Sequence, residues 1–293
     1  MGFPYLAYQL LKKHKHLIVG DSITANKKCL MFGRAKMSLS KEQVTEAVEI
    51  DNISEELLQG WAEPFLKDYG YDWIESLDYS AFEGAGYIWN LNNPLIQPTG
   101  NIKEILSTID LVLDYGTSEH LFNPGMSLWN ASALLKNGGC LNAILPLHGF
   151  TDHGFYQFSP SFFYAIDRPE FRLEALYFVV HGTKSGQLLL WDGLSSEFRE
   201  HVHGAFDGSF AANCLPLLNE KISAWALFRK TSPVINDEFM FNTQQLIYKT
   251  QWSGQTEVSD SNARKLEIYN ISPDKRVFEM IDYIKSIALT KFI

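Results

Sequence analysis

Short apolar runs alternate with longer amphipathic stretches over the first half of the chain. The apolar runs cover residues 28–34, 73–77, 86–89, 109–113 and 140–145. Each is followed by glycine, proline or polar residues. Helix-like segments separate the runs, such as residues 127–136, which we expect to stop at the glycine pair 138–139. Ser40 and Gln43 have the spacing of a helix-capping box. This order of strand, polar turn and helix predicts a doubly wound parallel α/β sheet.

The pattern changes after residue 171. Residues 173–181 and 187–191 look like two strands joined by a short glycine-containing loop, which predicts an antiparallel edge. Residues 222–229 have the pattern of a late strand. Residues 241–263 are rich in Gln, Ser and Thr and predict a loop, whereas residues 273–293 predict a terminal helix.

These segments divide the chain into three parts. Residues 1–27 join an apolar stretch to a basic one and predict an N-terminal helical cap, or lid. Residues 28–232 form the core domain, in which residues 146–170 are expected to serve as a substrate loop. Residues 233–293 are expected to form a C-terminal extension.

Composition narrows the classes of function. The chain has 293 residues with 25 basic and 34 acidic side chains, and this acidic balance argues against nucleic acid or an anionic membrane as a partner. Three widely separated cysteines form neither a disulfide framework nor a zinc knuckle. No apolar run reaches the roughly 18 residues that a membrane-spanning helix needs, and the N-terminal charge order is the reverse of a signal peptide's. We expect a cytoplasmic protein with a small-molecule substrate; the oligomeric state stays open.

Ligands of open α/β sheets bind beyond the carboxyl ends of the strands, so the residues that follow each strand are the first candidates for a site. Gly33 permits a tight turn close to a ligand, and Arg34 beside it could meet a carboxylate. Asp78 could accept hydrogen bonds from ribose hydroxyls, or be a solvated turn residue. Asn90 could hydrogen-bond an adenine edge with Leu91 against the ring, or simply close an Asx turn.

Residues 109–123 form the sharpest candidate, because an apolar strand leads directly into two acids, a histidine and an asparagine. Polar groups buried at such a point need partners. Glu119 is expected mainly to cap or pack the next helix, whereas His120 is as well suited to a site as to packing.

Residues 146–160 form a second dense stretch, where a substrate would lie. Its aromatic rings could face a sulfonium cation, and His153 or Tyr156 could accept a proton from a nucleophile. The alternative is a loop whose polar groups satisfy one another. A metal site at His148, Asp152 and His153 is a further interpretation, but their spacing, like that of the pairs His14/His16 and His201/His203, matches no metal motif, so no metal is predicted. No GxSxG, Walker or HExxH motif is present.

Several of these stretches resemble class I S-adenosylmethionine-dependent methyltransferases. Asp-Tyr-Gly-Thr-Ser-Glu-His at 114–120 resembles the motif after their fourth strand, and Leu-Leu-Lys-Asn-Gly-Gly at 134–139 resembles their Leu-Leu-Lys-Pro-Gly-Gly turn. Asp-His-Gly-Phe-Tyr-Gln-Phe-Ser-Pro at 152–160 is similar to a loop of a bacterial methyltransferase-like subgroup. The resemblance spans residues 28–232 and implies a Rossmann-like, mostly parallel seven-stranded sheet with an antiparallel edge.

The resemblance implies S-adenosylmethionine as the cofactor, with Gly33 near its methionine portion, Asp78 near its ribose and Asn90 near its adenine. Two positions depart from the family: the first glycine-rich motif is reduced to Phe-Gly-Arg-Ala at 32–35, and Asn90 stands where an Asp is usual. The cofactor-binding residues we expect are Gly33, Arg34, Asp78, Tyr79, Asn90, Leu91, Tyr115, Gly116, Thr117, His120 and Asn123.

Three functions follow from this resemblance. The first is methyl transfer to a small-molecule acceptor, with His153, His120 or Tyr156 as the base. The second is a cyclase that consumes the same cofactor and releases methylthioadenosine. The third is a catalytically silent binding protein that kept the fold.

Overall fold

The computed structural model describes residues 2–20, 26–96, 98–181, 188–195, 221–232 and 267–269. Its strands are β1 (Gly2–Pro4), β2 (Lys28–Phe32), β3 (Lys36–Ser38), β4 (Trp73–Asp78), β5 (Tyr87–Ile88), β6 (Ile109–Tyr115), β7 (Leu135–His148), β8 (Phe171–His181), β9 (Leu188–Asp192), β10 (Lys221–Lys230) and β11 (Glu267–Tyr269). Its helices are α1 (Tyr5–Lys13), α2 (Lys15–Ile18), α3 (Lys41–Asp51), α4 (Glu63–Tyr69), α5 (Pro124–Leu134) and α6 (Pro160–Ile166), with 3-10 turns η1 (Glu55–Leu58), η2 (Gly100–Ile105) and η3 (Ser118–His120). The loop predicted at 241–263 and the helix predicted at 273–293 lie outside the described residues.

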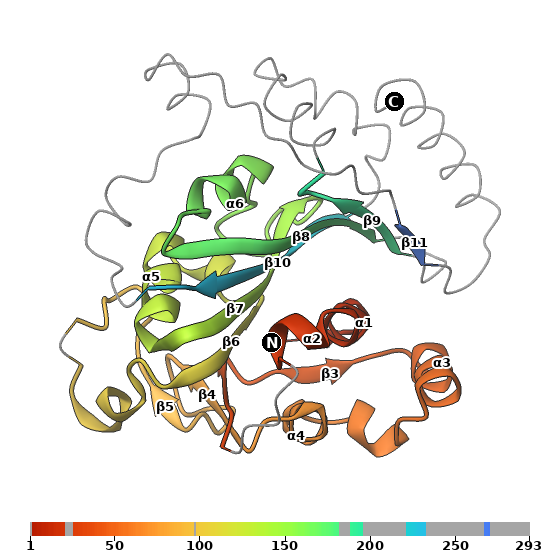
Figure 1. The fold of residues 1–293 in the computed structure, drawn as a ribbon, viewed down its shortest axis with the longest axis horizontal. Helices are drawn as coiled ribbons and strands as arrows, with labels where there is room; N and C mark the ends of the chain where they lie inside the picture. The colour runs from red at the N-terminus through yellow and green to blue at the C-terminus, as the bar shows by residue number, and fades with distance from the viewer. Residues whose placement is uncertain are drawn as a thin grey trace, which may run out of the picture.

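A large sheet in the order β11-β9-β8-β10-β7-β6-β2-β4-β5 forms the centre of the molecule (Figure 1). Five adjacent strands of this sheet, β5, β4, β2, β6 and β7, are parallel to one another. Strand β10 lies between β7 and β8 and is antiparallel to both. The seven adjacent strands β5, β4, β2, β6, β7, β10 and β8 confirm the expected mostly parallel seven-stranded sheet with an antiparallel edge. The predicted hairpin is present as β8 and β9, and β9 and β11 extend the sheet beyond these seven strands.

Side chains of the central strands alternate between two apolar layers. On β2, Cys29 and Met31 contact a cluster with α1, α2, α3 and α4, whereas Leu30 and Phe32 contact a second cluster with η2, α5 and α6. Helices therefore cover both faces of the sheet (Figure 1). A strand that is buried on both faces reads as a continuous apolar run, which is why the sequence locates β2 and β6 well.

The N-terminal segment is built into one of these layers. Residues Tyr5, Leu6, Ala7, Tyr8, Leu10 and Leu11 of α1 are all buried. Ahead of α1, β1 pairs in parallel with β3, an arrangement that the sequence does not predict. The segment expected as a cap thus packs on the sheet as part of the core. The capping box of Ser40 and Gln43 at the start of α3 is confirmed.

The sequence predicts that the glycine pair 138–139 ends a helix, but in the structure the pair lies inside β7. Helix α5 already ends at Leu134, because Leu135 adopts an extended conformation. Gly139 passes so close to β6 that an added Cβ would lie 2.7 Å from the Ile109 carbonyl oxygen. Only glycine permits this approach, and the pairing of β7 with β6 is irregular at this point.

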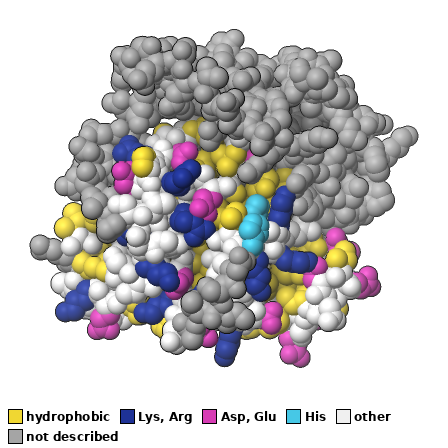
Figure 2. All heavy atoms as spheres, in the orientation of Figure 1, with side chains coloured by type: hydrophobic (Ala, Val, Ile, Leu, Met, Phe, Trp, Pro, Cys, Tyr) yellow, Lys and Arg dark blue, Asp and Glu magenta, His cyan; other side chains and the backbone are white. Residues whose placement is uncertain are grey.

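Acidic and basic side chains are mixed on the surface. Over the coloured part of the face in Figure 2, Lys and Arg side chains are interspersed with Asp and Glu side chains. Among the described residues, no helix has the length and apolar character needed to cross a membrane.

Candidate functional site

A cavity of about 620 Å³ lies where β2, β4 and β6 end. Its volume falls within the range of small-molecule sites, and its place at the carboxyl ends of parallel strands is where α/β sheets bind ligands. The lining residues are Gly2, Gly33, Leu77, Asp78, Tyr79, Glu83, Trp89, Asn90, Leu91, Asn92, Tyr115, Gly116, Thr117, His120, Leu121 and His153. Nine of the eleven residues expected to bind a cofactor are therefore gathered at one cavity, together with His153.

Two of the lining residues are glycines in a left-handed backbone conformation. Gly33 has a φ of 72° and Gly116 a φ of 101°, values that side-chain-bearing residues rarely adopt. The Gly33 amide donates to the Leu77 carbonyl at 2.8 Å, and the Thr117 hydroxyl donates to the Phe32 carbonyl at 2.6 Å. These bonds hold the loops after β2, β4 and β6 together.

Acidic and amide side chains follow β4 and β5. One carboxylate oxygen of Asp78 accepts the Tyr79 amide at 2.5 Å. Asn90 forms the Asx turn that the sequence left as an alternative, because its side-chain oxygen accepts the Asn92 amide at 3.0 Å. Trp89, between them in the sequence, also lines the cavity, and its indole Nε1 donates to the Asn93 carbonyl.

Three of the expected residues do not reach the cavity lining. The Arg34 guanidinium donates to Glu63 at 2.6 Å and lies over the Trp61 ring, so its charge is directed into a structural pair. Asn123 caps α5 by accepting the Met126 amide. Tyr156 donates its hydroxyl to the Phe122 carbonyl at 2.8 Å. Each of these three side chains interacts with another part of the protein, although each lies next to or near a lining residue in the sequence.

A buried aspartate fixes the turn that follows β6. Asp114 accepts the amides of Thr117 and Ser118 and the Ser118 hydroxyl, which also contacts the Ser127 hydroxyl. Burial raises the pKa of Asp114, whereas these hydrogen bonds lower it. The network holds η3 in a fixed orientation at the side of the cavity.

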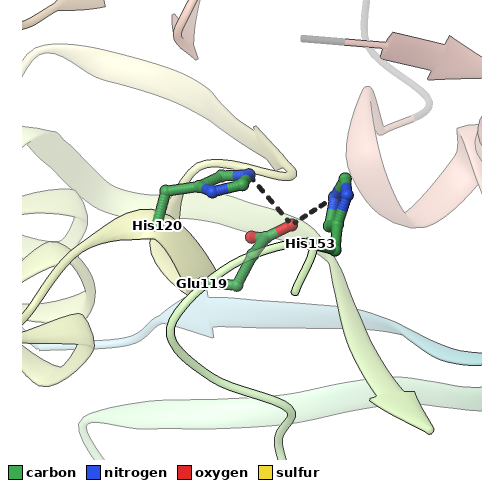
Figure 3. Close-up of side chains that lie close together, drawn as sticks. All are labelled: Glu119, His120 and His153. Atoms are coloured by element: carbon green, nitrogen blue, oxygen red, sulfur yellow. Dashed lines mark ion pairs between the residues drawn. The ribbon is translucent and has the colours of Figure 1, made fainter. Parts of the chain in front are cut away.

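Glu119, expected to cap or pack, instead lies between two histidines. Its side chain is 2% exposed, and its Oε1 lies 3.7 Å from Nε2 of His153 and 4.0 Å from Nε2 of His120 (Figure 3). Burial, with a contribution from Asp114, raises the pKa of Glu119 to about 8. Partial burial and the nearby His153 lower the pKa of His120. Sequence reasoning missed this group because His153 belongs to a distant loop; a polar residue directly after a buried strand was the available signal.

Two exposed aromatic rings lie beside this group. Phe122 is 78% and Phe155 is 70% exposed, and their ring centroids are 6.3 Å apart. Phe122 follows Leu121 of the lining, and Phe155 lies two residues after His153. An apolar surface therefore adjoins the histidine side of the cavity.

Comparison with known proteins gives fold similarities only. No protein-family model and no curated protein matches the chain. Among solved structures, the (4+2) cyclase SpnF is 11% identical over 76% of this chain and 81% of its own, with a TM-score of 0.39. A protein of Galdieria sulphuraria proposed to be a sarcosine dimethylglycine methyltransferase is 10% identical over 78% and 86%, with a TM-score of 0.41. A protein of Bacillus halodurans proposed to be a methyltransferase is 12% identical over 75% and 100%, with a TM-score of 0.32. Such distant similarities do not carry activity, cofactor or substrate from one protein to another.

Proposed function

We propose that the chain binds S-adenosylmethionine in this cavity and transfers its methyl group to a small-molecule acceptor. The observation that carries the proposal is the cavity at the ends of β2, β4 and β6, in which glycine backbone, a carboxylate and two histidines meet. The glycine and carboxylate side suits a nucleoside, and the histidine side suits an acceptor that must lose a proton.

The residues present fit the adenosine half of the cofactor. The Asp78 carboxylate can accept hydrogen bonds from ribose hydroxyls through the oxygen that the Tyr79 amide does not use. Trp89 and Leu91 offer apolar surface to the adenine ring. Among the described lining residues there is no Lys or Arg, so the methionine carboxylate would rely on backbone N–H groups near Gly33 and Gly116.

When bound, S-adenosylmethionine would supply a sulfonium methyl carbon, to which an acceptor lone pair would form a bond as the carbon–sulfur bond breaks, with adenosylhomocysteine as the leaving group. The protein's part is to hold the acceptor in line and take up its proton. His153 and His120 line the cavity and are the candidates for that role; burial and the nearby His153 lower the pKa of His120, which favours the neutral imidazole that a proton acceptor needs. Phe122 and Phe155 favour an acceptor with apolar surface.

The direct test is to incubate the purified protein with S-adenosylmethionine, with and without candidate acceptors, and to identify the nucleoside products by mass spectrometry. Adenosylhomocysteine formed only with an acceptor supports methyl transfer. Methylthioadenosine formed without one supports the cyclase instead, and binding without turnover supports a silent binding protein. Absence of binding would refute the proposal.

Replacing Asp78 with alanine should weaken S-adenosylmethionine binding. Loss of a charge-assisted hydrogen bond costs about 1.5–3 kcal/mol, which corresponds to an increase in Kd of about 10–150-fold. Isothermal titration calorimetry measures the change. Glu104→Ala is the matched control, because Glu104 is an exposed carboxylate outside the cavity lining. Equal affinities of Asp78→Ala and wild type would remove Asp78 from the ribose site.

A further inference from the structure

Three potential metal ligands converge on one side of the cavity. Glu119 and His120 come from η3, and His153 comes from the loop after β7. One ligand atom from each lies within 4.8 Å of the other two. Figure 3 shows both imidazoles directed at the same carboxylate oxygen. The two His–Glu distances, 3.7 and 4.0 Å, are too long for hydrogen bonds.

The backbone holds the two contributing loops together. The Glu119 carbonyl accepts the amides of Phe155 and Tyr156 at 2.7 and 3.2 Å. Gly154 permits this contact, since a Cβ there would lie 2.8 Å from that carbonyl oxygen and 2.9 Å from Glu119 Cγ. The backbone of the fold therefore brings the loop of Glu119 and His120 next to the loop of His153.

One oxygen of the Glu119 carboxylate, Oε2, is left without a hydrogen-bond partner within the described part of the chain. The Glu119 side chain is 2% exposed, and this oxygen is buried with it. Buried polar atoms are nearly always satisfied, and buried carboxylates are usually paired or bound to metal. The two neighbouring imidazoles add nitrogen donors on the side that faces the cavity, where His120 and His153 are about half exposed.

We propose that Glu119, His120 and His153 bind one divalent first-row transition-metal ion, with an open coordination position toward the cavity. One carboxylate and two imidazoles form a ligand set that zinc and iron(II) accept, and an incomplete protein shell is typical of catalytic ions. Bond lengths of about 2.0–2.2 Å place tetrahedral ligand atoms roughly 3.4 Å apart. The two His–Glu distances of 4.0 and 3.7 Å would have to shorten by a few tenths of an ångström, which rotations of the side chains would supply.

The open position gives the ion a role in the reaction. On the basis of the proposed function, an acceptor hydroxyl would coordinate there, and the ion would lower its pKa so that the proton passes to water. The two imidazoles, as ligands, would then not be the base. Coordination of the acceptor to the ion would restrict the acceptors to molecules with an oxygen or nitrogen atom that can bind a metal ion.

Metal titration of the full chain tests the proposal. Protein freed of metal with EDTA is titrated with Zn²⁺ by calorimetry, with Mg²⁺ as a comparison cation and Co²⁺ as a spectroscopic probe. We expect one Zn²⁺ per chain and a Co²⁺ visible spectrum typical of nitrogen and oxygen ligands. Glu119→Gln and His153→Ala should each lower Zn²⁺ affinity by at least about tenfold.

His148→Ala is the matched control, since His148 lies at the end of β7 but outside both the group and the cavity lining. It should bind Zn²⁺ as the wild type does. Circular dichroism establishes that each variant is folded, and Glu119→Gln keeps the shape of the buried side chain. Absence of Zn²⁺ binding by the wild type, or unchanged affinity in both Glu119→Gln and His153→Ala, overturns the proposal. S-adenosylmethionine binding is measured on the same samples, so failure of the metal site is distinguishable from failure of the proposed function.

Discussion

Replacing His153 with alanine should lower the rate of S-adenosylmethionine turnover by about 10²–10⁴-fold, the usual contribution of a positioned proton acceptor. The imidazole lines the cavity beside Glu119 and is 52% exposed, so its removal should leave the fold intact. Cofactor affinity should change little, because Asp78 and the glycine loops lie at the ends of β2, β4 and β6, whereas His153 lies in the loop after β7. Single-turnover kinetics and calorimetry measure the two quantities separately.

His148→Ala is again the appropriate comparison and should retain wild-type turnover. A chelator separates the two roles open to His153: if the imidazole is the base, metal-free wild type stays active, whereas a metal ligand predicts that activity returns only with Zn²⁺ or another divalent ion. If His153→Ala turns over at the wild-type rate under both conditions, His153 has neither role.

Strand positions follow from the sequence because the central strands are buried on both faces. The run at 28–34 predicts β2 to within two residues of each end. The run at 109–113 ends two residues before β6 does, since Asp114 resembles a polar turn residue. In the structure its carboxylate is buried and satisfied by Thr117 and Ser118. A satisfied buried acid cannot be distinguished from an exposed one by its position in the sequence.

The site was predictable where its residues lie at the carboxyl ends of neighbouring parallel strands. Gly33, Asp78 and Gly116 follow three neighbouring parallel strands, so topology alone brings them to one cavity. Glu119 and His153 meet because backbone bonds from Phe155 and Tyr156 join two distant loops, and no spacing rule encodes this contact. Gly2 reaches the cavity through the three-residue pairing of β1 with β3, which is too short to leave a pattern.

A second large effect concerns His181, at the end of β8. Its Nε2 lies 2.7 Å from the Ser223 hydroxyl, and among the described residues the positive charge of Lys221 acts on it. Burial, reinforced by Lys221, lowers the pKa of His181 from 6.5 to about 4. As the pH falls, His181 is therefore protonated near pH 6.5 in the unfolded chain but only near pH 4 in the folded chain. The contribution of neutral His181 to the free energy of unfolding is fully present above pH 6.5. It is lost as the pH falls toward 4, and the total loss is about 3 kcal/mol.

The variant His181→Gln should remove this part of the acid sensitivity, because glutamine can hydrogen-bond Ser223 without titrating. Between pH 7 and pH 4, the free energy of unfolding of the variant should fall by about 3 kcal/mol less than that of the wild type, as measured by urea denaturation at each pH. His16→Gln, which changes an exposed imidazole, should follow the wild-type curve. If the free energies of unfolding of wild type and His181→Gln fall equally with pH, the imidazole of His181 takes up its proton in the folded protein as readily as in the unfolded chain. Water at the end of β8, or a local opening there, would then hydrate the charged imidazole.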